Sequence, residues 1–110
     1  MESFDHRDRD FVFLINDSNN MGGKSRLVIE ILLNVLDRGP EPPVSNNDRI
    51  ALIKFSKKSN RVFSLVQKEK NFTQLKNQIE KLNLGKSGQD ANLGKALVNA
   101  MSEFRSRGER

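Results

Sequence analysis

The chain has 110 residues, of which 35% are hydrophobic and 30% are charged, a composition typical of a single globular domain with a polar surface. It has no cysteine and only one histidine, His6, which excludes disulfides and thiolate metal sites and disfavours zinc binding and histidine-based catalysis. The net charge of +5 suggests some affinity for anionic partners. Because the basic residues are scattered among acidic ones and Trp and Tyr are absent, a solvated basic surface is favoured over a nucleic-acid-binding one.

No apolar run is long enough to span a membrane, since the longest, Leu27 to Leu36, is interrupted by Glu30 and Asn34. The first nine residues, Met1 to Arg9, are charged and lack the apolar stretch of a secretory signal. We expect them to form a flexible lead-in. A cytoplasmic or other intracellular protein with no membrane partner is therefore predicted.

The first predicted strand is Asp10–Ile15, a nearly continuous apolar run typical of a strand covered on both faces. It ends at a cluster of turn-forming residues, Asn16–Gly23. A helix is predicted over Lys24–Arg38, where a wide apolar stripe on a 3.6-residue period indicates substantial burial. Gly39-Pro40 ends this helix, and a stiff loop leads to Asn47.

The second strand, Asp48–Phe55, has the same buried character, and Arg61–Leu65 is expected to pair back onto it as a hairpin. Asn71 is predicted to cap a helix whose apolar residues run from Phe72 to Leu82.

A glycine-bearing loop, Leu84–Asn92, precedes a last helix from Leu93 to Phe104, whose apolar stripe is interpreted as an ordinary core face. Residues 10–105 are expected to form one domain and residues 106–110 a charged tail. The order strand, helix, strand, strand, helix, helix predicts an α/β three-layer sandwich, with a mainly parallel sheet carrying one antiparallel edge strand.

In such a sheet, ligands bind beyond the carboxyl ends of the strands. Two loops qualify, residues 16–23 and 85–92. The first carries Asn16-Asp17-Ser18-Asn19-Asn20-Met21-Gly22-Gly23, and the second leads into Gln89-Asp90-Ala91-Asn92-Leu93-Gly94-Lys95-Ala96-Leu97. Between them lies Asp48-Arg49-Ile50-Ala51-Leu52-Ile53-Lys54-Phe55. The order and spacing of these segments resemble the N-terminal part of a von Willebrand factor A-type domain, a truncated Rossmann-like fold.

The resemblance implies a divalent-cation site, the metal-ion-dependent adhesion site, in which hydroxyls and carboxylates of the two loops hold the ion and an acidic partner completes its shell. Ser18 matches the family's first serine, but Asn16 replaces its leading aspartate, Asn20 its second serine and Ala91 its threonine. The family's later aspartate would lie beyond Arg110. Because Mg²⁺ needs about six hard oxygen ligands, we expect a degenerate, metal-free site without a cofactor. If a cation were retained, its ligands would be Asn16, Ser18 and Asn20.

The family's domains usually carry about six strands, whereas this chain has material for three. The sheet is thus expected to have an open edge. A protein partner or a second copy would cover it, unless the chain is a piece of a longer protein.

Two further hypotheses start from the same loops. Gly23-Lys24-Ser25 follows a strand and opens a helix, as in a phosphate-binding loop, but Ser18 stands where that motif requires its first glycine. The Gly23-Lys24-Ser25 loop and the surface lysines together suggest the alternative function, a basic module associated with nucleic acid or phosphate. Asp17 and Asp90 are the candidate carboxylates for catalysis, and we interpret them as solvated loop residues.

The sequence therefore predicts a non-catalytic interaction or scaffold module, a subunit of a larger assembly. Its expected contact residues are Asn16, Asp17, Ser18, Asn20, Lys24, Asp90 and Asn92.

Overall fold

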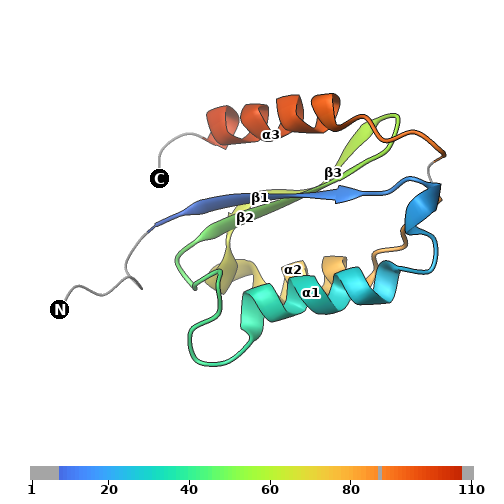
Figure 1. Ribbon diagram of the computed structural model, residues 1–110. Helices are drawn as coiled ribbons and strands as arrows, with labels where there is room; N and C mark the ends of the chain where they lie inside the picture. Colours follow the sequence, from blue (N-terminus) through green and yellow to red (C-terminus); the bar gives the residue numbers. More distant parts are fainter. Residues whose placement is uncertain (1–7, 87, 108–110) are drawn as a thin grey trace.

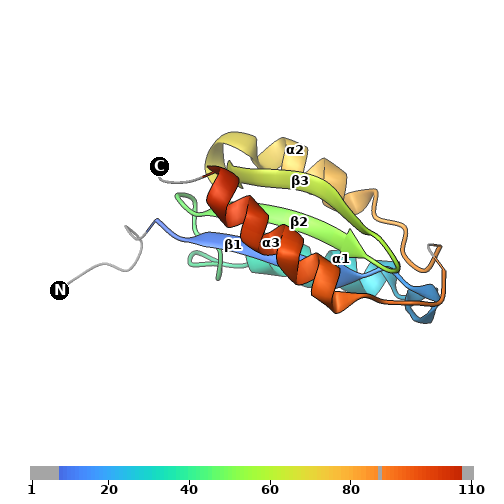
Figure 2. The same ribbon diagram turned by 90° about the horizontal axis from the view of Figure 1, so that it is seen from above.

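The computed structural model describes residues 8–86 and 88–107, which form three layers (Figure 1). A three-stranded sheet is the middle layer. Helices α1 and α2 cover one of its faces, and α3 crosses the other (Figures 1 and 2). In chain order the elements are β1 (Asp10–Asn16), η2 (Asn19–Met21), α1 (Ser25–Asp37), β2 (Arg49–Phe55), β3 (Ser59–Gln67), α2 (Lys68–Glu80) and α3 (Leu93–Arg107).

The strand order in the sheet is β1-β2-β3. β1 runs parallel to β2 from the pair Asp10 and Arg49 to the pair Asn16 and Phe55, and β3 is antiparallel to β2. The predicted α/β sandwich with an antiparallel edge strand is thereby confirmed. The hairpin strand is longer than predicted, since β3 begins at Ser59 and continues to Gln67.

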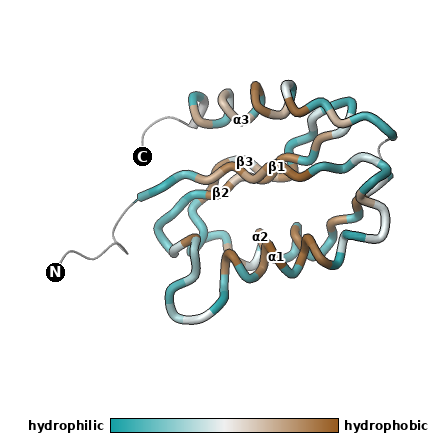
Figure 3. The backbone as a smooth tube through the Cα atoms, in the orientation of Figure 1, coloured by the Kyte–Doolittle hydropathy of each residue, from teal (hydrophilic) through white to brown (hydrophobic). Residues whose placement is uncertain are grey.

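The strand β2 forms the centre of the core because it has a neighbour on each side. Ile50 and Leu52 pack with buried residues of α1 and α2 in one cluster. Ala51 and Ile53 are also buried and, because strand residues alternate between faces, they face α3. The tube coloured by hydropathy shows apolar strands between polar connections (Figure 3).

The prediction that the helix after the first strand is substantially buried is wrong in its extent. Only Ile29, Leu32 and Leu36 of α1 are buried, while Leu27 and Ile31 are 58% and 52% exposed. The apolar residues of α1 extend around more of the helix than the three-stranded sheet and α2 can cover, so some of them remain exposed.

The interpretation of the last helix as an ordinary core face is also wrong. Against the sheet α3 buries the small residues Ala96 and Ala100 together with Glu103. Its large apolar residues are about half exposed, namely Leu93, Leu97, Val98, Met101 and Phe104.

Asn71 does not cap the second long helix as predicted. α2 already begins at Lys68, and Asn71 lies inside it with non-helical angles, φ −121° and ψ 15°. Its side-chain Nδ2 donates to the carbonyl of Gln67. Asn71 thus marks a kink between a first helical turn and the amphipathic part of α2.

Long-range polar contacts connect distant parts of the chain at the end of the sheet where β1 and β2 begin. Asp48, fully buried, accepts from the backbone N–H of Arg9 at 3.0 Å and from its Nη2 at 2.9 Å. The buried Lys68 Nζ donates to the carbonyls of Leu36 and Val44, both at 2.6 Å. Burial lowers the pKa of Lys68 despite the nearby carboxylate of Asp37 and others.

The described residues extend beyond the predicted domain, 10–105, at both ends. Most of the expected lead-in lies outside the described residues, but Arg9 is bound to Asp48. The helix α3 continues to Arg107, into the segment expected to be a charged tail, whose last three residues are outside the described part.

Candidate functional site

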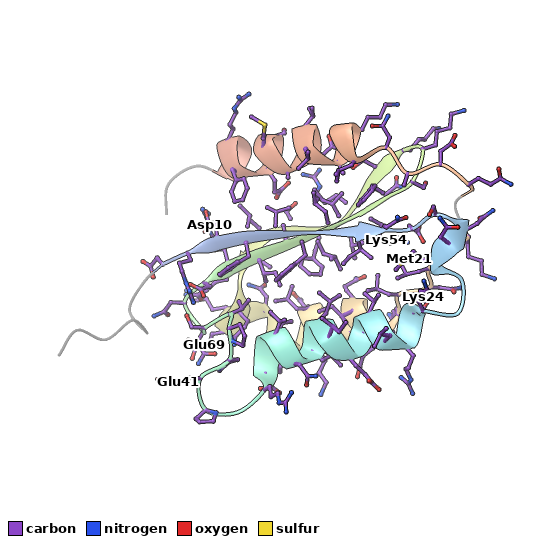
Figure 4. The ribbon with its side chains drawn as sticks, in the orientation of Figure 1. Asp10, Met21, Lys24, Glu41, Lys54 and Glu69 are labelled. Carbon is purple, nitrogen blue, oxygen red and sulfur yellow. The ribbon has the colours of Figure 1, made fainter. Side chains whose placement is uncertain are left out.

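The candidate site is at the carboxyl ends of β1 and β2, where the loops 17–24 and 81–92 meet (Figure 1). The first loop starts with a side-chain turn, in which Asn16 Oδ1 accepts the backbone N–H of Ser18 at 2.8 Å. The short 3-10 turn η2 follows, and Lys24 N donates to Met21 O before α1 begins. Met21, Lys24 and Lys54 lie at this end of the sheet, and Asp10, Glu41 and Glu69 lie at the other (Figure 4).

Direct hydrogen bonds join the two loops. Asn19 N donates to Gly88 O at 2.7 Å. From the second loop, Gly85 N donates to Asp17 Oδ1 at 3.0 Å, and Leu84 N to the hydroxyl of Ser25 at 2.8 Å. The sequence predicts that the loops lie near each other, but not that these groups hold them together.

Gly85 is the point of closest approach between the loops. Its φ of +88° is in the left-handed region, and a Cβ placed there would lie 2.4 Å from the nitrogen of Gly22. Any side chain would therefore push the two backbones apart. The only sequence signal for this role was a glycine in a loop, which is too common to single out one position.

Asp17 is not the solvated carboxylate that the sequence suggested, since only 2% of the residue is exposed. One carboxylate oxygen accepts the N–H of Gly85, and the other lies 3.7 Å from Lys54 Nζ. The backbone N–H of Asp17 donates to Phe55 O and extends the contact between β1 and β2. The buried Asp17 therefore links the two loops through its carboxylate, whereas Asp90 is exposed.

The second loop is also tied to the sheet and to α3. Asn92 N donates to Ser56 O at 2.7 Å. The side-chain Oδ1 of Asn92 accepts from Lys95 N at 3.1 Å, which caps the first turn of α3. Asn92, predicted as a contact residue, thus also has a structural role.

The donors available for a cation are few. Ser18 is 1% exposed, and its hydroxyl has no hydrogen-bond partner among the described residues. Asn16 Oδ1 already accepts a hydrogen bond, Asn20 is exposed, and Ala91 has no side-chain donor. Within residues 8–86 and 88–107, no three His, Cys, Asp or Glu side chains are grouped so that they could hold a metal ion.

The residues that the sequence singled out thus divide into two sets. Asp17 and Ser18 are buried beneath the loops, and Asn16 is partly buried. Six of the exposed polar residues of the two loops form what we call the loop face, namely Asn19, Asn20, Lys24, Lys86, Asp90 and Asn92.

A small α/β sheet covered by helices on both faces defines a Rossmann-like fold, in which ligands bind beyond the carboxyl ends of the parallel strands. The chain belongs to the von Willebrand factor type A domain family, whose model matches residues 10–110. This confirms the resemblance seen in the sequence. Domains of this family typically mediate protein–protein interaction or adhesion.

Solved structures share the fold at low sequence identity. An uncharacterized membrane spanning protein from Vibrio fischeri matches with a TM-score of 0.75 and 17% identity, over 94% of this chain and 52% of that one. Proximal thread matrix protein 1 from the mussel byssus, with a zinc-occupied metal-ion-dependent adhesion site, gives 0.69 and 17%, over 87% and 24%. The vWF domain of the type V pili tip protein Mfa5 from Porphyromonas gingivalis gives 0.61 and 21%, over 90% and 33%.

The chain therefore spans about half the length, or less, of the structures that it matches. No curated protein shows significant sequence similarity to it. Among the described residues, no helix has the length and apolar character needed to cross a membrane.

Proposed function

We propose that the chain is a non-catalytic protein-interaction module of a larger intracellular assembly, which contacts its partner through the loop face without a bound cation. The observation that carries this proposal is the direct closure of the two loops. The bonds from Gly85 to Asp17 and from Asn19 to Gly88 fix the exposed polar groups before a partner arrives. A surface that is already ordered loses less conformational entropy on binding. A chain without cysteine forms no disulfide and needs no oxidising compartment.

The donor set supports independence from metal ions. A Mg²⁺ ion needs near-octahedral oxygen coordination and usually one or two carboxylates. In this chain the carboxylate nearest to the family's ligand positions, Asp17, is engaged with Gly85 and Lys54. The hydroxyl of Ser18 alone would not offset the dehydration of the ion.

The outer side of β1 is the second part of the proposed contact surface. Within the described residues β1 pairs on one side only, with β2. An unpaired strand edge presents a row of N–H and C=O groups to a partner.

No observation favours the phosphate or nucleic-acid alternative. The hydroxyl of Ser25, which a phosphate-binding loop would direct at its ligand, accepts the N–H of Leu84. Several basic side chains are paired internally, including Arg9, Arg49, Lys54 and Arg61.

Site-specific photo-crosslinking tests the loop contact. A benzophenone amino acid is placed at Asn20 on the loop face, and at the exposed Gln74 on α2 as the matched control. In cells that express the chain, we expect a discrete protein adduct from position 20 and none from position 74, unchanged when EDTA is added to the extract before irradiation. Equal adducts from both positions would overturn the assignment of the loop face, and loss of the adduct in EDTA would overturn metal independence.

Calorimetric titration of the purified chain with Mg²⁺ and Mn²⁺ gives a second readout. We expect no binding heat up to about millimolar cation, the range of weak oxygen-ligand sites. Micromolar binding of either ion would contradict the proposed metal independence and leave the loop contact itself untouched.

A further inference from the structure

A groove lies between the hairpin of β2 and β3 and the helix α3, and we call it the hairpin groove. It consists of two adjoining hollows, of about 500 Å³ and about 270 Å³, which share Ser59 and Asn99. The side-chain Nδ2 of Asn99 donates to the hydroxyl of Ser59 at 2.6 Å, so the hairpin and the helix are joined where the hollows meet. The tip of the hairpin reaches toward the first turn of α3 (Figure 1).

The hairpin groove is positively charged. Lys58 from the hairpin and Lys95 from α3 line the larger hollow, and Arg61 lines the smaller one. Of the described residues that line the groove, Glu103 is the one with a carboxylate, and this carboxylate is buried and bound to Leu65 N and Arg61 Nη1. The two lysines therefore have no acidic residue facing them within the groove, which attracts anionic groups.

The groove also offers further hydrogen-bond donors and an apolar contact. Glu103 accepts from Nη1 of Arg61, and a guanidinium carries more N–H donors on its other nitrogens. Val98 is 65% exposed and lines the larger hollow together with the two lysines. A complementary occupant therefore combines carboxylates with an aliphatic side chain. A peptide supplies both, whereas stacked bases would need aromatic side chains, which are absent from the described lining residues.

The groove is on the side of the sheet that a strand following α3 would not cover. The unit β1-α1-β2 moves across the sheet from β1 to β2 with α1 on one face. Crossovers between parallel strands share one handedness, so a crossover through α3, on the opposite face, moves the other way. It would place the next parallel strand beside β1, away from β3 and the hairpin groove.

We propose that the hairpin groove binds a short acidic segment of a protein partner, in which carboxylates flank an aliphatic residue. The inference rests on the proposed role as a protein-interaction module and adds the chemistry of one partner segment. Carboxylates of the segment pair with Lys58 and Lys95, and its aliphatic side chain packs on Val98. The larger hollow is within the range of ~300–1,000 Å³ that is usual for ligand pockets.

Titration of the ¹⁵N-labelled 110-residue chain with a synthetic peptide, followed by NMR, tests the proposal. The probe is the capped peptide Glu-Glu-Leu-Glu-Glu, and its uncharged control is Gln-Gln-Leu-Gln-Gln. We expect saturable shifts of the amide signals of Ser59, Lys95 and Asn99 with the acidic probe, with a dissociation constant of about 1 mM or lower, and none with the control. Equal shifts with both peptides, or no saturation with the acidic probe, would overturn the proposal.

Charge reversal in the groove separates a specific site from attraction by net charge. Lys58→Glu and Lys95→Glu should each raise the dissociation constant about fivefold or more, because each replaces an attraction with a repulsion. The matched control is Lys76→Glu, at an exposed position of α2, which changes the net charge equally and should alter binding by less than about twofold. Equal weakening in all three variants would contradict a site in the groove. The amide spectrum of each variant verifies its fold.

Inorganic phosphate distinguishes a peptide site from a plain anion site. We expect it to compete only weakly, since it makes no contact with Val98. Complete displacement of the probe by an equal concentration of phosphate would overturn the assignment to a peptide.

The outcome is separable from that of the loop contact. A chain that gives the adduct from position 20 but does not bind the acidic probe contradicts only the groove. Saturable probe binding by a chain without that adduct contradicts only the loop contact.

Discussion

Ser18 and Asp17 are neighbours in the sequence, and both are buried, yet the fold uses them differently. Both oxygens of Asp17 have a partner, Gly85 N at 3.0 Å and Lys54 Nζ at 3.7 Å. The hydroxyl of Ser18 has none among the described residues. A buried hydroxyl without a partner lowers stability because it loses its hydrogen bonds to water on folding.

The substitution Ser18→Ala therefore tests what this hydroxyl does. We expect the free energy of unfolding to stay the same or rise by up to ~1 kcal/mol, since the removed group had no partner. Urea denaturation with and without Mg²⁺ measures it. If instead Mg²⁺ stabilised the parent chain and this stabilisation disappeared in Ser18→Ala, the hydroxyl would be a metal ligand.

At the scale of elements, the loop face depends on the contact between Gly85 and Gly22. Gly85→Ala adds a Cβ at 2.4 Å from Gly22 N and also strains a φ of +88°. We expect a loss of ~3 kcal/mol or more, because backbone atoms cannot move aside as a flexible side chain can. The matched control is Gly39→Ala, with a φ of +73° but open space around it, which should cost only ~1–2 kcal/mol. Equal losses in urea denaturation would show that the close approach is unimportant.

The attachment of α3 to the sheet is a second feature at this scale. Glu103 is 2% exposed, and its carboxylate accepts Leu65 N at 2.7 Å and Arg61 Nη1 at 2.8 Å. Because the other buried residues of α3 between positions 93 and 105 are the small Ala96 and Ala100, this carboxylate holds the helix in position.

Glu103→Ala should therefore cost ~2–4 kcal/mol, since it leaves the N–H of Leu65 without its acceptor. Glu103→Gln, which retains one side-chain oxygen, should cost less. Arg61→Gln is expected to change stability by less than ~1 kcal/mol, because the Arg61 side chain is 57% exposed. Thermal unfolding of the three variants measures the order, and a larger effect at Arg61 than at Glu103 would contradict it.

For the whole molecule, Asp48 joins the start of the sheet to the long loop before β2. Burial alone would raise the pKa of Asp48, but hydrogen bonds from Arg9 and Ser45 hold it below its ordinary value of 3.8. A depressed carboxyl pKa contributes stability that is present above the unfolded-state value and is lost as the pH falls through the folded-state value. This contribution should be complete above about pH 4 and disappear at lower pH.

We expect Asp48→Asn to cost ~2–4 kcal/mol at neutral pH, since it leaves the Arg9 cation without its partner carboxylate, and to flatten the fall in stability below about pH 4. Glu41→Gln, at an exposed position of the same loop, is the control and should change neither quantity much. Urea denaturation at pH 3, 4 and 7 measures both, and an unchanged acid profile in Asp48→Asn would contradict this role.

Much of the architecture could be predicted from the sequence because it depends on local patterns. The apolar runs that became β1 and β2 and the turn formers after Ile15 fixed the order of the elements and the position of the loops. The family likeness rested on the same segments and is confirmed by the match over residues 10–110. The start of α2 was predicted at Asn71 instead of Lys68. An Asn inside a kink, whose side chain donates to Gln67 O, cannot be distinguished in the sequence from an Asn that caps a helix.

The sequence by itself determined the spacing of the apolar residues. That spacing determined which segments form strands and helices, and at which end of the sheet the polar loops lie. Only the tertiary structure decided which apolar residues are covered. Leu97 and Leu36 both belong to apolar stripes, but Leu36 is fully buried in the core cluster, while Leu97 is 49% exposed. Whether an apolar side chain is covered depends on neighbours that are distant in the chain. The same holds for the burial of Asp17 and for the contact of Gly85 with Gly22, so no local sequence pattern could predict them.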